Sequence, residues 1–314
     1  MNPEQTKPAV IIPCHNRKEI TLNCFTILEK QGVLEDFQTI LVDDGSTDGT
    51  AEEMKKRFPQ VEILTGDGNL FWTGAIELGM RHAFEAGASS FIWLNDDSTV
   101  ARSAIDAITQ RAETLGGIVS GQGKVEIKSQ DFEWYFPIMM KGKNRLSLND
   151  VDLSKEEIPA DTCRGNLVAV SRKVVEKIGF PDGRGVPHYG GDTDYGLRAT
   201  KAKLPLHILT KALVIEEGLI RDDNESWLLG NKTIGQILKT IFSKRSNRYP
   251  PMVFIYNTRH WGIRGFFTAL LTYVKLAGIL TLKVFTPRAL RIRLFGKHST
   301  AWKSLEVMRE DASS

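Results

Sequence analysis

The sequence predicts an α/β fold, in which a mostly parallel central sheet carries helices on both faces and a basic amphipathic helical region follows. Three observations lead to this prediction. Short apolar runs alternate with segments of helical spacing over residues 1–100, and three of the four runs end in polar clusters. The charge also changes sign: residues 1–227 carry 26 Lys and Arg against 35 Asp and Glu, whereas residues 228–314 carry 15 against 3.

The first elements are predicted from apolar runs and a capping pattern. Ala9–Pro13 reads AVIIP, a continuous run typical of a strand buried on both faces, and residues 18–31 follow with helical spacing. Thr39–Val42 is the second predicted strand. Thr50 and Glu53 fit a capping box, which predicts that a short helix begins there.

The later elements continue the alternation and then become less regular. We expect a strand at Val61–Leu64, a helix at Gly74–Ala86, a strand at Phe91–Leu94 and a helix at Ala101–Leu115. Beyond these we expect strands within 117–140, a charged surface insertion at 141–160, a strand within Asp161–Ser171 and a short helix at Arg172–Ile178.

The composition excludes several classes of protein. With 41% hydrophobic and 25% charged residues, the chain is close to the average soluble domain, which argues against a disordered chain, a collagen-like fibre or a polytopic membrane protein. Cys14, Cys24 and Cys163 form neither a disulfide framework nor a zinc motif. The N-terminus has no basic segment followed by a long apolar run, so we expect no signal peptide and a cytoplasmic location.

The tail, residues 228–314, differs in kind from the rest of the chain. Its apolar stretches are interrupted by Arg264, Lys275 and Lys283, and its longest uncharged stretch, Gly265–Val274, is well short of the ~20 residues that span a bilayer. Basic residues interleaved with aromatic ones favour helices that lie on an anionic membrane surface. The alternative is a pair of helices packed on the preceding domain. The basic charges are too diluted by apolar runs to indicate nucleic-acid binding.

Four motifs in order resemble the family 2 glycosyltransferases of the GT-A fold: VIIPCHNR, ILVDDGSTDGT, WLNDDS and HYGGDTDYGLRA, within about residues 8–220. The resemblance implies an inverting transfer of sugar from a nucleoside-diphosphate sugar to a hydroxyl of a glycan or polyprenyl-linked acceptor, as in rhamnosyltransferase-like enzymes of bacterial surface polysaccharides. It also implies a catalytic domain over 1–227, with a nucleotide half at about 1–100 and an acceptor half at about 101–227. The tail at 228–314 would then hold the enzyme on the inner face of the cell membrane.

The first two motifs are expected to bind the nucleotide. By the resemblance Asp44 contacts the base, while Pro13, His15 and Asn16 line the base and ribose. A carboxylate also suits the N–H that a uracil or thymine ring presents between two carbonyl groups. The alternative is that such residues, Asp43 above all, only form turn and cap hydrogen bonds.

A glycine-containing segment, GDGNLFWTGA at residues 66–75, is similar to the family's segment beneath the sugar nucleotide. The resemblance implies that Asn69 and Gly74 approach the donor and that Trp72 stacks on it. Packing of Trp72 in the core is the alternative.

The third motif takes the place of the family's metal-binding carboxylates. A diphosphate leaving group needs a hard cation, and Mg²⁺ or Mn²⁺ prefers carboxylate oxygens. We expect Asp97 to be the direct ligand and Asp96 to contact the ribose or support the site, while Asn95 adds no charge. An acidic helix cap is the alternative. Where relatives carry a metal-binding histidine, this chain has Glu216 and Glu217, of which Glu216 is the candidate ligand.

The fourth motif is expected to supply the base. Asp192 matches the family's catalytic aspartate, although Gly191 stands where a second acidic residue is usual. Asp194 and Arg198 are expected to pair with each other, and Asn166 to lie near the transferred sugar. A general base contributes roughly 10²–10⁴-fold to a rate.

Two other functions remain open from the sequence. A sugar-nucleotide pyrophosphorylase would need a glycine-rich loop after the first strand, whereas CHNRKEIT contains no glycine. A non-catalytic sugar-nucleotide-binding or membrane-docking module would not need both Asp97 and Asp192.

Overall fold

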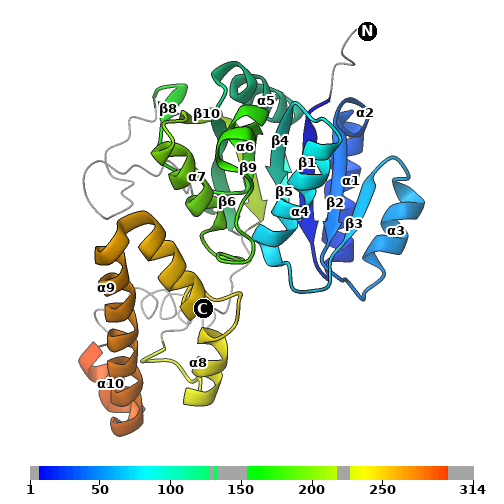
Figure 1. The fold of residues 1–314 in the computed structure, drawn as a ribbon. Helices are drawn as coiled ribbons and strands as arrows, with labels where there is room; N and C mark the ends of the chain where they lie inside the picture. The colour runs from blue at the N-terminus through cyan, green and yellow to red at the C-terminus, as the bar shows by residue number, and fades with distance from the viewer. Residues whose placement is uncertain (1–6, 128–129, 133–153, 218–226, 296–314) are drawn as a thin grey trace. The chain divides into compact units, whose positions relative to one another are not determined.

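The computed structural model describes residues 7–127, 130–132, 154–217 and 227–295. The chain divides into two compact units, Met1–Gly218 and Leu219–Ser314. The sequence-based boundary, after residue 227, falls later than this division. Figure 1 labels the helices and strands of both units.

In its described part, the first unit contains one sheet of ten strands. They run β1 Ala9–Cys14, β2 Gln38–Asp43, β3 Glu62–Thr65, β4 Ser90–Leu94, β5 Ser98–Val100, β6 Ile118–Ile127, β7 Gln130–Phe132, β8 Glu157–Pro159, β9 Leu167–Ser171 and β10 Leu206–Glu217. The order across the sheet is β3-β2-β1-β4-β9-β6-β10-β5, with β7 beside β6 and β8 beside β10. Strands β1 to β4 pair in parallel, whereas β9 is antiparallel to both β4 and β6. The predicted α/β class with a mostly parallel central sheet is therefore confirmed, and the antiparallel strands make the sheet a mixed one.

Helices cover both faces of the sheet (Figure 1). They are α1 Lys18–Lys30, α2 Val33–Asp36, α3 Thr50–Arg57, α4 Phe71–Glu85, α5 Arg102–Leu115, α6 Arg172–Ile178 and α7 Gly191–Lys201. The alternation of side chains along a strand explains the continuous apolar runs. Val10 and Ile12 of β1 pack in one core with α1 and α5, while Ala9 and Ile11 pack in the other with α4 and α7.

The structure corrects two local predictions. Helix α3 begins at Thr50 as expected, but its N-cap is Gly49, and no capping box forms. Asp48 instead accepts a hydrogen bond from the Thr50 amide at 3.1 Å, because its side chain reaches the first turn from outside the helix. The second correction concerns the charged insertion predicted at 141–160: residues Glu157–Pro159 form β8, which pairs with β10. Residues 133–153 of that insertion lie outside the described part of the chain.

The C-terminal unit is helical where it is described, with α8 at Ile234–Ile241, α9 at Pro250–Phe285 and α10 at Arg288–Phe295. Ile237, Ile241 and Leu276 form a small core with Trp227, Tyr273 and Leu280 packed against it. Gly262 departs from helical geometry at φ 57°, ψ −135° and kinks α9. A positive φ of this kind costs glycine little, which explains the position of the kink.

Helix α9 corrects the expectation that no segment of the tail is long enough to cross a bilayer. By length and composition alone, α9 is able to cross a bilayer, and only 11% of its most apolar 18-residue segment is buried. The expectation counted uncharged residues in a row, whereas the apolar part of α9 continues on both sides of Lys275.

Candidate active site

The candidate site forms at the carboxyl ends of three adjacent parallel strands. Strand β1 lies between β2 and β4, and its last residue, Cys14, is in register with Asp43 of β2. The residues that follow the three strands, beginning at His15, Asp44 and Asn95, therefore lie at one edge of the sheet. Ligands of α/β proteins bind at this edge, because the loops after the strands meet there.

Asp44 holds the segment that leads into α4. Its side chain is buried, and its Oδ1 atom accepts hydrogen bonds from the amides of Gly68 at 2.9 Å and Leu70 at 3.2 Å. The Oδ2 atom accepts a third from the Phe71 amide at 2.9 Å. A carboxylate has about four acceptor positions, so these bonds leave room for one further donor, on Oδ2.

His15 and Asn16 join the loop after β1 to the loop after β2. The Nδ1 atom of His15 lies 2.6 Å from the Asp44 carbonyl oxygen and donates to it, while the side-chain Nδ2 atom of Asn16 lies 3.1 Å from Nε2. Asn16 adopts a left-handed φ of 51°, and its Oδ1 atom accepts from the Thr47 amide at 2.7 Å. Pro13 lies in β1 opposite Val42.

Arg17, to which the sequence analysis assigned no role, links the two carboxylates of the third motif. Its guanidinium donates to Asp96 Oδ1 and to Asp97 Oδ2, each at 2.9 Å. The two carboxylates differ in burial, since the Asp96 side chain is 3% exposed and that of Asp97 is 23% exposed. Thr21 donates a further hydrogen bond to Asp96 at 3.0 Å. Asp97 is therefore the carboxylate that solvent reaches.

Burial decides the acidity of Asp96. Desolvation raises the pKa of its carboxyl to about 6, against the opposing effect of the Arg17 charge and with a smaller contribution from Asp97. The buried carboxyl packs inside the fold and forms its contacts with protein groups. The buried Asp96 thus stabilises the turn after β4, and the more exposed Asp97 is the better placed of the two to bind a ligand.

Asn95 connects the third motif to the rest of the site. Its side-chain oxygen accepts a hydrogen bond from Trp72 Nε1 at 2.8 Å, and its amide donates to the carbonyl of Asn166 at 3.4 Å. The Trp72 ring also meets Trp93 edge to face, with centroids 5.7 Å apart. Trp72 is therefore part of the packing beneath the site, as one of the two interpretations of the sequence expected.

Asp192 lies in the first turn of α7, and backbone groups orient its carboxylate. Its Oδ2 atom accepts from the Gly165 amide at 2.9 Å, and its Oδ1 atom accepts from the Thr193 amide at 2.7 Å. A Cβ atom at Gly165 would lie 2.4 Å from the Trp72 ring and 3.3 Å from the Asp192 Cβ. Gly165 is thus the point at which Asp192 approaches Trp72.

These contacts connect the fourth motif to the third. Asp192 bonds to Gly165, Gly165 packs on Trp72, and Trp72 bonds to Asn95, two residues before Asp97. Asn166 adds a direct backbone link to Asn95. Asp192 is therefore linked through Gly165 and Trp72 to Asn95, the residue that begins the turn carrying Asp97.

Gly191 departs from the usual acidic residue for a steric reason. A Cβ atom there would lie 2.0 Å from Thr73 Oγ1, so no side chain fits between α7 and α4. Asp194 and Arg198 approach each other at 4.0 Å, and Arg198 donates to the Phe180 carbonyl at 2.9 Å, in line with the supporting role expected for the pair.

Asn69, Glu216 and His207 are not among the contacts that link Asp192 to Asn95. Asn69 is exposed and donates its amide to Asp67 Oδ1 at 2.8 Å. Glu216 lies in β10 opposite Ser98, the residue after Asp97; its side chain and that of Glu217 lie outside the described structure. His207 pairs with Glu157 on β10 and β8.

The carboxylates present are compatible with a hard divalent cation bound together with phosphate. Among the side chains that the structure describes, no three His, Cys, Asp or Glu residues form a complete ligand set. The partly exposed Asp97 carboxylate offers oxygen ligands, and Mg²⁺ commonly takes one or two carboxylates and completes its shell with water and phosphate oxygens. Arg17 already neutralises part of the charge on Asp97, so a cation would share or replace that contact.

A mixed sheet with carboxylates and amides at its carboxyl edge is typical of α/β proteins that bind ligands at the strand ends. Residues 9–179 match the sequence model described as Glycosyl transferase family 2, and the chain belongs to this family. No curated protein matches the chain in sequence.

Among solved structures, the fold is similar to the crystal structure of GalNAc-T7 with UDP, GalNAc and Mn²⁺, with a TM-score of 0.55 at 12% sequence identity. The similarity covers 75% of this chain and 48% of that one, so the chain spans about half the length of that protein. At this identity the likeness shows the GT-A fold and no more.

Proposed function

We propose that the protein transfers a sugar from a nucleoside-diphosphate sugar to a hydroxyl group of a glycan or lipid-linked glycan, with inversion at the anomeric carbon. The continuous group of contacts that joins Asp192 to the turn bearing Asp97 carries this proposal. Transfer requires one carboxylate facing the incoming hydroxyl and another beside the departing diphosphate. Membership of a glycosyltransferase family and the likeness to a structure with UDP and Mn²⁺ bound support the same donor class.

The donor would lie along the strand ends. Asp44 has one acceptor position left, which suits the N–H of a pyrimidine base, with Pro13, His15 and Asn16 beside it. Asn69 and Asn166 would contact the diphosphate and sugar, and Asp96 would hold the turn from which Asp97 projects. The rhamnosyltransferase-like subtype is part of the proposal and rests on the sequence resemblance alone.

Asp97, with Glu216 opposite the adjacent Ser98, would hold Mg²⁺ or Mn²⁺. Such a cation, when bound, stabilises the charge that develops on the leaving diphosphate, which is worth several kcal/mol. Arg17 keeps the Asp97 carboxylate in place before the cation arrives, since its second nitrogen is anchored on the buried Asp96.

Asp192 would act as the general base. The Gly165 and Thr193 amides hold its carboxylate in one orientation without neutralising it. It would accept the proton of the acceptor hydroxyl as the oxygen attacks the anomeric carbon. A single displacement needs no covalent sugar–enzyme intermediate, so one base is sufficient.

The test is the Asp192→Asn variant, which keeps the side-chain shape and one of the two accepted hydrogen bonds while removing the base. We expect donor binding, measured by calorimetry with Mn²⁺, to stay within a few-fold of the parent, and transfer to fall about 10²–10⁴-fold. Unchanged transfer would remove the base assignment. A parent protein that binds donor yet neither transfers nor hydrolyses it would favour a non-catalytic module, and synthesis of sugar nucleotide from sugar phosphate would favour a pyrophosphorylase.

We also propose that residues 1–227 are the catalytic domain and that the tail, residues 228–314, associates with the cytoplasmic face of an anionic membrane, where a polyprenyl-linked acceptor would be found. Apolar side chains exposed on α9, among them Ile263, Phe267 and Leu271, together with the basic charge of this region, support this part of the proposal.

A further inference from the structure

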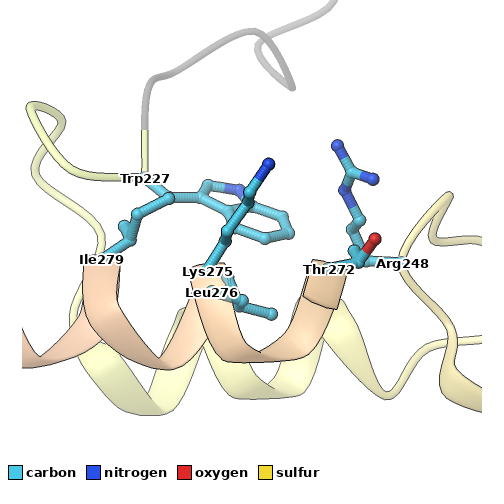
Figure 2. Close-up of a pocket in the computed structure, with 6 residues that line it drawn as sticks. All are labelled: Trp227, Arg248, Thr272, Lys275, Leu276 and Ile279. Carbon is cyan, nitrogen blue, oxygen red and sulfur yellow. The ribbon is translucent and has the colours of Figure 1, made fainter. Parts of the chain in front are cut away.

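A cavity of about 350 Å³ lies within the C-terminal unit. None of the residues that line it belongs to the candidate active site. Its lining residues are Trp227, Arg248, Thr272, Lys275, Leu276 and Ile279 (Figure 2). The last four come from one face of α9, because residues three, four and seven positions apart align on a helix. The volume lies at the lower end of the range of small-ligand sites.

The polar groups of the cavity suit an anion. Figure 2 shows the Lys275 ammonium and the Arg248 guanidinium directed to the same side of α9, with the Thr272 hydroxyl beside Arg248. Residues 227–295, the described part of this unit, contain no Asp or Glu, so neither cation has a carboxylate partner within it. An ammonium, a guanidinium and a hydroxyl that line one cavity are groups by which proteins bind phosphate oxygens.

The wall of the cavity is held in place by the core of the unit. Tyr273 donates a hydrogen bond from its hydroxyl to the Arg248 carbonyl at 2.8 Å, and the Arg248 amide donates to Ser246 Oγ at 3.0 Å. Trp227 packs against the core formed by Ile237, Ile241 and Leu276. The backbone that carries Arg248 is thus fixed relative to α9, which reduces the entropy lost when a ligand binds.

Helix α9 also carries an exposed apolar stripe, away from the cavity. The stripe is formed by Ile263, Phe266, Phe267, Leu270, Leu271 and Val274. At 100° per residue the stripe and the cavity residues lie on opposite sides of the helix. If the stripe rests on hydrocarbon, the cavity opens away from it, toward water and head groups.

We propose that this cavity binds the phosphate or diphosphate group of an organic phosphate ester, with Arg248, Lys275 and Thr272 on the phosphate oxygens. The Trp227 ring, Leu276 and Ile279 would contact the less polar part of the ester. A lipid and a soluble metabolite both carry such an ester, and the same three side chains would recognise either. This site goes beyond the proposed transfer reaction, because all its lining residues lie in the C-terminal unit.

The test uses the full chain in EDTA, which suppresses cation-dependent binding at the candidate active site. Pyrophosphate and short-chain phosphatidic acid, below its micelle concentration, are titrated while tryptophan fluorescence is recorded in the parent and in Trp227→Phe. We expect a saturable change that is absent from Trp227→Phe. Tighter binding of phosphatidic acid would identify a lipid source, and equal or tighter binding of pyrophosphate a soluble one.

The double variant Arg248→Gln/Lys275→Gln should weaken binding at least about tenfold, because hydrogen bonds to charged groups are lost. Its matched control, Arg264→Gln/Arg293→Gln, removes the same charge from exposed positions of the same unit outside the cavity and should stay within about twofold. Thr272→Val, which keeps the side-chain shape, gives a second measure that does not alter charge. No saturable signal, or equal losses in both double variants, would overturn the proposal.

Discussion

At the scale of single residues, Arg17 joins two carboxylates that differ in burial. Its loss would remove the charge that opposes the raised pKa of the buried Asp96 carboxyl, so this carboxyl would either stay charged without its cation or take up a proton inside the fold. Removing one partner of a buried ion pair typically costs about 3–5 kcal/mol, and the partial exposure of Arg17 lowers this expectation. We therefore expect Arg17→Gln to reduce the free energy of unfolding by about 2–3 kcal/mol in urea titrations at pH 7.

Arg102 provides the matched control for this prediction. It also bridges two carboxylates, Asp36 and Asp106, at 2.9 and 2.8 Å, but their side chains are 63% and 49% exposed. Exposed pairs contribute little, so Arg102→Gln should cost less than about 1 kcal/mol. Equal losses for the two variants would show that burial of Asp96 is not what makes the Arg17 contact important.

The three cysteines permit a second prediction at this scale. All are buried, and burial is the main cause that raises the pKa of the thiols of Cys14, Cys24 and Cys163. Since the thiolate is the reactive form, we expect none of them to react with a disulfide reagent at pH 8 in the native protein, and all three to react after unfolding. Rapid labelling of any thiol in the folded chain would contradict this description of the core.

At the scale of elements, the contact between α7 and α4 depends on Gly191. A methyl group there would meet the Thr73 side chain, so Gly191→Ala should destabilise the protein by about 1–3 kcal/mol through overpacking. Gly235 in the first turn of α8 is the control, because nothing lies within 4 Å of an added Cβ. Thermal unfolding should show Gly235→Ala to be neutral or slightly stabilising, and a similar loss at both positions would refute the steric explanation.

The elements that the sequence predicted best are those with strong local periodicity. Strands β1, β2 and β4 and helix α5 follow from apolar runs and helical spacing. The prediction for α3 identified its start but not its cap, because Asp48 and Thr50 both have side chains that can cap a helix. Strand β8 was missed because three residues carry too little periodic signal, and its pairing with β10 depends on a distant part of the chain.

At the scale of the whole molecule, the apolar stripe of α9 predicts membrane binding. We expect the full chain to float with vesicles that contain anionic lipid, and less so as salt rises, because the basic charge of the tail contributes. Phe266→Ser/Phe267→Ser should reduce the floating fraction several-fold. Leu213→Ser, which changes an exposed apolar residue of the first unit, is the control and should have no effect. Loss of floating in the control alone would contradict the role of α9.

The mode of membrane binding is a separate prediction. If α9 lies on the surface as proposed, an alkaline carbonate wash should release the protein from vesicles or membranes. Retention after the wash would show that α9 crosses the bilayer, which its length and composition also permit.

For the site, sequence motifs indicated the correct strand ends but not the contacts between them. Asp44, proposed for the base, also holds the start of α4 through three amides, and nothing in its motif specified those partners. The role of Arg17 was not predicted, because one of its partners, Asp97, lies 80 positions away in the sequence. The signal that was available is the CHNR motif itself, which places a cation directly after a strand that ends beside carboxylates.

The sequence by itself determined the alternation of strands and helices over residues 1–100, the family, and which polar residues follow the strands there, since all of these depend on local spacing and residue type. Only the tertiary structure decided that Asp96 is buried while Asp97 is exposed, that Gly165 brings Asp192 to Trp72, and that Gly191 must lack a side chain. The physical reason is that burial and close packing arise between segments far apart in the chain, where local periodicity carries no information about which atoms will meet.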